Sequence, residues 1–158
     1  METTNTEWRR RNMHKGHGFT LLEFLIALLI VSFGLLGIAG IIANSMKSNQ
    51  SAYFRSQAVV MADDIIDRMR ANRITADGGA TSPYTSPYNL PLAAAPSGGG
   101  VPEDDLTQWR SALAVTLPSG NGSVAVATTK KVTVVVQWDD SRAAGGDGAQ
   151  QFIVETRL

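Results

Sequence analysis

One stretch decides the fold of this chain: Gly18-Phe19-Thr20-Leu21-Leu22-Glu23-Phe24-Leu25-Ile26-Ala27-Leu28-Leu29-Ile30. It opens an apolar run that ends at about Ile42, and Glu23 is the only charged residue in that run. At ~1.5 Å per residue, a helix over 19–42 is ~36 Å long, which is enough to cross a bilayer. An ionisable group inside such a segment is costly, so we expect Glu23 to have a function and a partner.

The residues before this run form a basic leader. Residues 1–18 carry four basic and two acidic side chains, net +2, whereas the remainder carries ten basic and twelve acidic ones, net −2. A positive flank keeps the N-terminus in the cytoplasm and sends the C-terminal part across the membrane. The apolar run is too long for a secretory signal and lacks a small-residue exit, so we expect the anchor to be retained.

Composition excludes several classes of chemistry. The chain has no cysteine, and both histidines, His14 and His17, lie in the leader. Ser-His-Asp and Cys-His catalysis and metal sites built on imidazole or thiolate are therefore excluded beyond Gly18. Packing without disulfides must hold the domain together. No basic run exceeds Lys130-Lys131, so we expect no nucleic-acid surface, and we expect no cofactor.

The helix is expected to continue far beyond the apolar run, because no proline occurs between Phe19 and Arg73. We predict one helix of about 55 residues, apolar all round over 19–42 and amphipathic over 43–73. In the amphipathic part, residues that recur every three or four positions form a stripe along one side and predict the face that packs on the rest of the domain. Asp64 and Arg68 lie beside this stripe at the favourable i,i+4 spacing. The stripe consists of Val59, Ala62, Ile65, Ile66, Met69 and Arg73.

The rest of the chain predicts a small sheet. Residues 74–102 are rich in Gly, Pro and Ser and predict an exposed connection. Residues 103–158 predict a short helix that buries Leu106, Trp109 and Leu113, followed by three or four antiparallel strands. The expected strands are Ser123–Thr128, Val132–Trp138 and Gln150–Leu158. The fold class is therefore α+β, with the amphipathic half of the long helix covering the sheet.

The junction at Gly18 has two interpretations. Gly18 can be an ordinary residue at the start of a signal anchor, or it can be the unhindered position that a protease at the membrane surface requires. Together with the basic leader, Phe19, Thr20 and Glu23 favour the protease. The run Gly18-Phe19-Thr20-Leu21-Leu22-Glu23 closely resembles that of the type IV prepilin-like proteins, which include type IV pilins, minor pilins and type II secretion pseudopilins.

The resemblance implies a processing pathway and a pilin-like fold. A membrane prepilin peptidase would cut after Gly18 on the cytoplasmic side, and the leader 1–18 would be removed. The new terminal residue, Phe19, would then be N-methylated. Glu23, the fifth residue counted from Phe19, matches the family's glutamate. Met13 is an alternative start that would shorten the leader without moving the cut.

Glu23 has a physical role if the cut occurs. Phe19 would then expose an ammonium group in or near lipid, where an unpaired carboxylate costs several kcal/mol or becomes protonated. A subunit whose terminus meets Glu23 relieves that cost, which makes Glu23 an assembly contact. The alternative is a carboxylate tolerated near the membrane interface.

Three glycines interrupt the apolar helix: Gly34, Gly37 and Gly40. Each costs ~1 kcal/mol of helix propensity relative to alanine. Close approach of a second helix, local flexibility and ordinary glycine enrichment in a transmembrane helix are three explanations that the sequence leaves open. Many major pilins have a helix-breaking proline where this chain has Gly40, so local melting is not carried over.

A narrower resemblance lies towards the C-terminus. Trp109 with Leu113, Leu117-Pro118-Ser119-Gly120 and Trp138-Asp139-Asp140-Ser141-Arg142 are similar to the PilV group of minor pilins, called type IV pilus modification proteins. The resemblance implies a non-enzymatic minor pilin in the inner membrane that primes or modifies pilus assembly. Its partners would be prepilin peptidase, other minor pilins, the major pilin and the assembly platform. Adhesion, twitching motility and DNA uptake all remain open as roles of the fibre.

Two other functions are alternatives to a minor pilin. A type II secretion minor pseudopilin would share the anchor but act in secretion. A membrane-anchored periplasmic enzyme is disfavoured because His and Cys are missing and no acid pair marks a cleft. A calcium site at Asp139, Asp140 and Asp147 is disfavoured against a solvated turn, because no EF-hand spacing is present.

Overall fold

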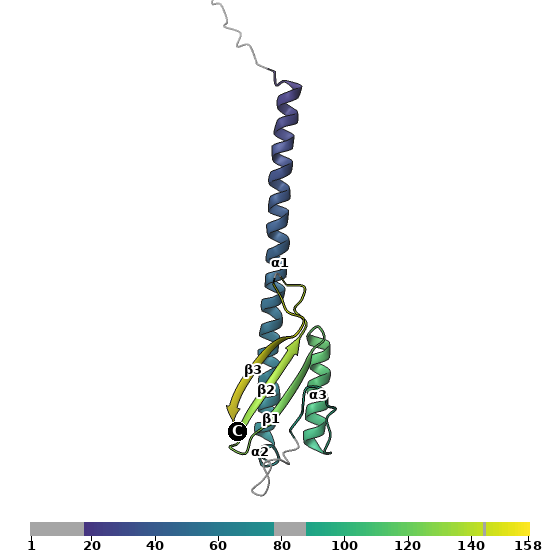
Figure 1. Cartoon of the computed structure of the whole chain (residues 1–158), viewed down its shortest axis with the longest axis vertical. Coiled ribbons are helices and arrows are strands. Elements are labelled where there is room, and N and C mark those ends of the chain that lie inside the picture. The colour runs from purple at the N-terminus through teal and green to yellow at the C-terminus, as the bar shows by residue number, and fades with distance from the viewer. Residues whose placement is uncertain (1–17, 78–87, 144) are drawn as a thin grey trace, which may run out of the picture. The chain divides into compact units, whose positions relative to one another are not determined.

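The computed structural model describes residues 18–77, 88–143 and 145–158. The chain divides into two units, residues 1–40 and 41–158, and each is described by itself. Apart from Gly18, the expected leader lies outside the described residues. Residues 78–87 of the expected connection also lie outside them. The elements in chain order are α1 (Leu21–Ala71), α2 (Arg73–Ala76), α3 (Val101–Thr116), β1 (Asn121–Val126), β2 (Lys131–Trp138) and β3 (Gln150–Arg157) (Figure 1).

Helix α1 is 51 residues long and continuous through all three glycines of its apolar half. It ends sooner than the sequence predicted, because Asn72 leaves helical geometry at φ −109° and ψ 42° before the four-residue α2 begins. At this break the Asn72 side chain donates a hydrogen bond to the Tyr88 hydroxyl at 3.4 Å. The prediction of one unbroken helix to Arg73 is therefore wrong in its last turn.

The sheet has three strands in the order β1-β2-β3, and both pairs are antiparallel. Val124 pairs with Val134 across the first ladder, and Val134 pairs with Val154 across the second. Lys130 turns the chain between β1 and β2 with a φ of 61°, and its N–H donates to Ala127 O at 2.9 Å. Beyond these strands the described residues add one isolated bridge, from Leu90 to Val124, and no fourth strand.

One face of the sheet carries the core of residues 41–158. The second half of α1 and helix α3 both pack on this face, and Figure 1 shows α1 running behind the strands. Burial in β2 alternates along the strand, as the sequence predicted. The large side chains that are fully buried include Trp109 and Leu113 from α3, Ile65 and Met69 from α1, and Val132, Val134, Val136 and Trp138 from β2. The α+β prediction, with the long helix packed on an antiparallel sheet, is confirmed.

Two residues of the predicted packed face, Val59 and Arg73, are exposed, and Arg73 lies beyond the end of α1. Val59 is 39% exposed, and its neighbour Ala58 is buried instead, because the contacting stripe of α1 runs through Ala58, Ala62, Ile65, Ile66 and Met69. Most described residues of the expected connection are exposed or half-buried, but Ala76, Tyr88 and Leu90 are buried in the core.

A polar network ties that connection to the two helices. Tyr88 Oη donates to Asp105 Oδ2 of α3 at 2.5 Å, and Arg68 of α1 contacts Asp105 Oδ1 at 3.4 Å. Arg68 also pairs with Asp64 at 3.0 Å, which confirms the expected i,i+4 pair. Burial, reinforced by the hydrogen bond to Asp105, raises the pKa of Tyr88 to about 12.

Arg110 fixes the chain that follows Leu90. Its guanidinium donates to the carbonyl oxygens of Pro91 at 2.9 Å, Leu92 at 2.5 Å and Gly122 at 2.9 Å, and also to that of Ala94. All of these acceptors are backbone carbonyls, which Arg can reach together because its planar head presents several donors. Burial lowers the pKa of Arg110. This one side chain therefore attaches the loop to β1.

Candidate processing and assembly site

The junction before α1 is non-helical and exposed. Gly18, Phe19 and Thr20 have no regular secondary structure, all three are exposed, and the helix begins at Leu21. The peptide between Gly18 and Phe19 therefore lies just outside the helix. Hydrolysis requires access to the scissile carbonyl, so this is the conformation that a processing protease needs.

Thr20 fixes the place where the helix begins. The Glu23 N–H donates to Thr20 Oγ1 at 3.2 Å, and the Phe24 N–H donates to Thr20 O at 3.2 Å. These two bonds define an N-cap, because the side-chain oxygen takes an otherwise unpaired donor while the carbonyl already accepts the first helical bond. The spacing from Thr20 to Glu23 is the T-x-x-E pattern of a capping box, a local signal from which this role of Thr20 could be predicted.

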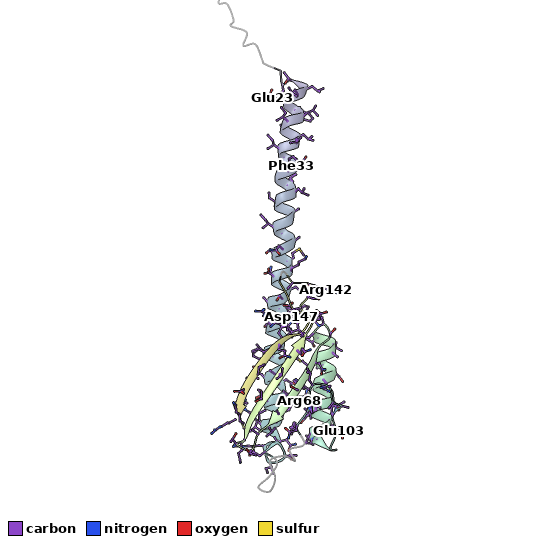
Figure 2. All side chains as sticks on the ribbon, viewed as in Figure 1. Glu23, Phe33, Arg68, Glu103, Arg142 and Asp147 are labelled. Carbon is purple, nitrogen blue, oxygen red and sulfur yellow. The ribbon has the colours of Figure 1, made fainter. Side chains whose placement is uncertain are left out.

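Glu23 lies on the first turn of the helix with an exposed side chain (Figure 2). It lines a shallow apolar hollow with Phe19, Phe24 and Ala27. Within the described residues its carboxylate has no hydrogen bond or ion pair, so the capping box is not closed by a return bond to Thr20. The structure thus brings Phe19 and Glu23 together and leaves the Glu23 carboxylate available to another group.

The apolar half of α1 is exposed along its length. Leu21, Phe33 and Leu36 are between 68% and 79% exposed, and side chains project outward all round this part of the helix (Figure 2). Its most apolar 18-residue window has a mean hydropathy of 2.8, and none of that window is buried. By length and composition, α1 can cross a bilayer. Exposing this much apolar surface to water is unfavourable, so the segment requires lipid or other helices around it.

The three glycines lie on this exposed part of α1. A Cβ placed on Gly34, Gly37 or Gly40 would meet nothing within 4 Å in the structure. No contact within the described chain therefore explains why these positions are glycine. Close approach by a helix from another molecule remains one of the three explanations.

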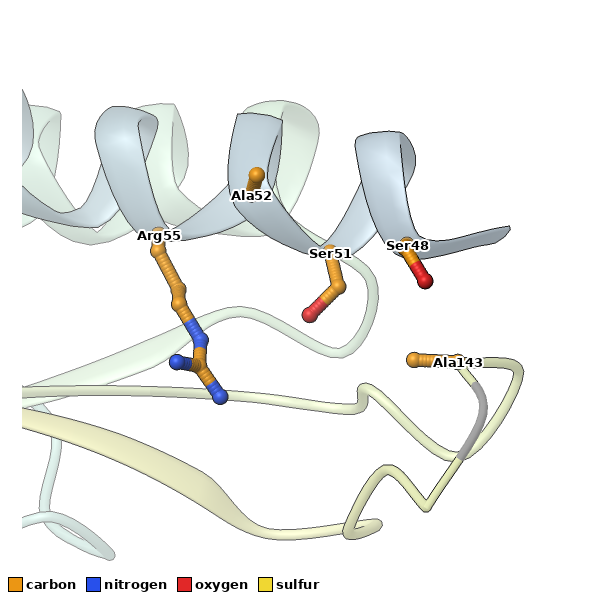
Figure 3. Close-up of a pocket in the computed structure, with 5 residues that line it drawn as sticks. All are labelled: Ser48, Ser51, Ala52, Arg55 and Ala143. Carbon is orange, nitrogen blue, oxygen red and sulfur yellow. The ribbon is translucent and has the colours of Figure 1, made fainter. Parts of the chain in front are cut away.

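A shallow hollow of about 210 Å³ lies between α1 and the turn after β2. Figure 3 shows it lined by Ser48, Ser51, Ala52, Arg55 and Ala143. Ser51 Oγ donates to Asp140 Oδ2 at 2.5 Å, which connects α1 to the turn and pairs an Asp140 side chain that is only 4% exposed. The hollow is a by-product of this structural connection.

Two of the three aspartates of this turn, Asp139 and Asp147, accept hydrogen bonds from its backbone. Asp139 Oδ1 accepts the Ser141 N–H at 2.9 Å, and hydrogen bonds from Ser141 lower the pKa of Asp139. Asp147 Oδ1 accepts the Ala149 N–H at 3.1 Å. No group of three or more His, Cys, Asp or Glu residues in the described segments is placed to hold a metal ion. The carboxylates of Asp139, Asp140 and Asp147 therefore each bond a group of this chain.

Comparison with known families gives one match at the same place. Residues 13–39 match the model of the prokaryotic N-terminal methylation motif. The chain carries the motif typical of type IV prepilin-like proteins. The motif implies processing by prepilin peptidase, and the pilin-like proteins of which it is typical are structural rather than catalytic. A search of curated proteins and a search of solved structures each gave no match.

Proposed function

We propose that this prepilin-like chain is a minor pilin of a type IV pilus. Prepilin peptidase cuts between Gly18 and Phe19, and Phe19 is N-methylated. The protein then spans the inner membrane once, with its N-terminus in the cytoplasm and residues 43–158 in the periplasm. From there it enters the fibre with the major pilin, other minor pilins and the assembly platform, and primes or modifies assembly.

The observation that carries the proposal is the junction itself. An exposed, non-helical Gly18–Phe19 peptide lies just before a helix whose apolar side chains are exposed. The methylation motif matches at the same residues. Retention of the helix after the cut gives a product with a charged terminus and a large apolar surface. Such a product suits polymerisation through helix packing, since neighbours can cover the exposed side chains.

The position of Glu23 supports its proposed role as an assembly contact. Its side chain shares a hollow with Phe19, whose nitrogen becomes an ammonium group when the peptide is cut. A neighbouring subunit that brings its own terminus to this hollow pairs two charges that are otherwise costly in apolar surroundings. Assembly then depends on the register between neighbouring helices.

The assignment to the PilV group is supported by the C-terminal residues that resemble it. Trp109 and Leu113 are fully buried beneath the sheet, and Trp138 ends β2 with 1% of its surface exposed. Asp140, within the same Trp138–Arg142 motif, anchors the following turn to α1 through Ser51. These residues belong to the core and to the turn after β2. A domain with the same fold would therefore require similar residues at these positions.

The experiment that tests the minor-pilin proposal locates the protein. An epitope-tagged full chain is expressed at native level, pili are sheared from the cells, and the fibre and membrane fractions are probed. We expect tagged protein in sheared pili, in substoichiometric amount to the major pilin, and fewer surface pili when the gene is deleted. Absence from pili together with a defect in protein secretion would instead support the type II secretion minor pseudopilin.

A further inference from the structure

We infer that Thr20 is a positioning residue for the cut. Its hydroxyl caps α1 and so keeps the Gly18–Phe19 peptide outside the helix, where a protease can take it. The inference rests on the proposed processing between Gly18 and Phe19 and assigns a role to a neighbouring residue that is not itself cut or methylated.

The cap at Thr20 sets the start of α1. Thr20 Oγ1 accepts the Glu23 N–H at 3.2 Å, and Thr20 O accepts the Phe24 N–H at 3.2 Å, whereas Phe19 is non-helical. A side chain without an acceptor at position 20 leaves the Glu23 N–H unpaired in a segment that borders lipid. The helix must then find another cap or lose its first turn.

The next available cap lies on the far side of the cut. Phe19 is a poor capping residue, but Gly18 ranks close to threonine at this position. A helix capped at Gly18 is two residues longer and takes Phe19 as its first residue. The scissile peptide then belongs to the helix terminus, and the Phe19 carbonyl enters the helical hydrogen-bond pattern.

In a complete capping box the glutamate side chain turns back to the N–H of the capping residue. Within the described residues, α1 has only the bond from the Glu23 backbone to Thr20, and the Glu23 carboxylate makes none. Thr20 therefore orders the first turn through the backbone and leaves the carboxylate available for assembly.

The test uses the full-length precursor in lipid–detergent micelles with purified prepilin peptidase. Thr20→Val keeps the side-chain shape and removes the acceptor, whereas Thr20→Ser and Thr20→Asn keep a capping oxygen. We expect roughly fivefold slower cleavage of Thr20→Val, the rate ratio that corresponds to a typical N-cap effect, with near wild-type rates for the Ser and Asn variants. Ser32→Ala is the matched control, because Ser32 bonds only to Leu28 O within the helix and its loss should leave the rate unchanged.

Backbone measurements separate positioning from a direct contact with the peptidase. In Thr20→Val the Phe19 Cα chemical shift should move towards helical values, whereas in the Ser and Asn variants it should stay at the wild-type, non-helical value. Equal cleavage rates for wild type and Thr20→Val, or an unmoved Phe19 shift in a slowed Thr20→Val precursor, would overturn the role of Thr20 alone. A wild-type precursor left uncut between Gly18 and Phe19 would overturn the proposed processing as well.

Discussion

Glu23 is the residue on which the proposed assembly depends. Its carboxylate shares an apolar hollow with Phe19 and has no partner within the described chain. If the chain is cut, the N-terminal ammonium group of a neighbouring subunit can form an ion pair with the Glu23 carboxylate. Leaving one member of such a pair unpaired in apolar surroundings costs ~3 kcal/mol or more.

The variant Glu23→Ala should therefore be cut and inserted normally but fail to assemble. We expect at least about a tenfold drop in its abundance in sheared pili at equal expression, since ~1.4 kcal/mol corresponds to a factor of ten. Quantitative immunoblotting of fibre and membrane fractions measures this. Asp63→Asn is the control, because Asp63 is an exposed acid farther along α1, beyond the apolar run. Normal incorporation of Glu23→Ala would contradict the assembly role.

Tyr88 gives a second prediction at the residue scale, about stability against pH. Its pKa is raised from 10.0 to about 12, chiefly by burial and then by the hydrogen bond to Asp105. An acid whose pKa is raised by folding stabilises the folded state below pH 10, and that contribution is lost as the pH rises towards 12. The wild-type chain should therefore lose stability across this interval through Tyr88.

Tyr88→Phe isolates that contribution. The variant should be ~1 to 2 kcal/mol less stable than wild type at neutral pH, because Asp105 loses a donor. The difference between the two chains should then shrink or reverse by pH 12, since phenylalanine does not ionise. Denaturation of both chains in micelles, monitored by tryptophan fluorescence, measures this. A difference that stays constant with pH would show that Tyr88 is not buried as described.

At the scale of elements, the loop after Tyr88 depends on Arg110. Four carbonyl groups from the loop and β1 accept hydrogen bonds from its guanidinium. Lysine cannot replace this set, because a single ammonium group cannot reach carbonyls that a planar head reaches in several directions.

We therefore expect Arg110→Lys to cost ~1 to 3 kcal/mol of stability and to speed amide exchange at Leu90, whose N–H donates to Val124 O at 2.8 Å. Hydrogen exchange followed by mass spectrometry measures the second effect. Arg55→Lys is the control, since Arg55 is exposed and makes no ion pair among the described residues. Unchanged exchange at Leu90 in Arg110→Lys would contradict the attachment.

Glycines at two places in the chain should respond oppositely to alanine. A Cβ on Gly122 of β1 would overlap the ring of Trp109 and Leu113 Cδ1, so Gly122→Ala should cost ~1 to 3 kcal/mol. A Cβ on Gly34 meets nothing within 4 Å, so Gly34→Ala should favour the helix by up to ~1 kcal/mol in the isolated subunit. Circular dichroism during thermal unfolding in micelles compares the two. Similar destabilisation by both changes would contradict the difference in packing.

The elements show why some features could be predicted from sequence and others could not. The alternating valines of β2 and the spacing of Leu106, Trp109 and Leu113 are local patterns, and their burial followed directly. The burial of Ala58 in place of Val59 depends on how closely α1 approaches the sheet, which no local pattern records. The carbonyl contacts of Arg110 join segments that are distant in sequence, and an arginine in a helix gives no sign of them. Unlike the contacts of Arg110, the cap at Thr20 has a local sequence signal, because the T-x-x-E spacing from Thr20 to Glu23 is typical of a helix N-terminus.

At the scale of the whole molecule, the two units have different needs. Residues 41–158 contain the buried core and a satisfied polar network. Residues 18–40 contribute nothing to that core, and their apolar side chains are exposed. A chain built in this way has its functional surface at the N-terminal end, which is also where the methylation motif matches. We propose that removal of the leader 1–18 creates that end, and that assembly depends on this cut.

Intact-mass analysis of the protein from cells with and without prepilin peptidase tests this most directly. With active peptidase, we expect the mass of residues 19–158 plus one methyl group, whether translation starts at Met1 or Met13. Without peptidase, the leader should be retained and the methyl group absent. A chain that keeps residues 1–18 in cells with active prepilin peptidase would contradict the account.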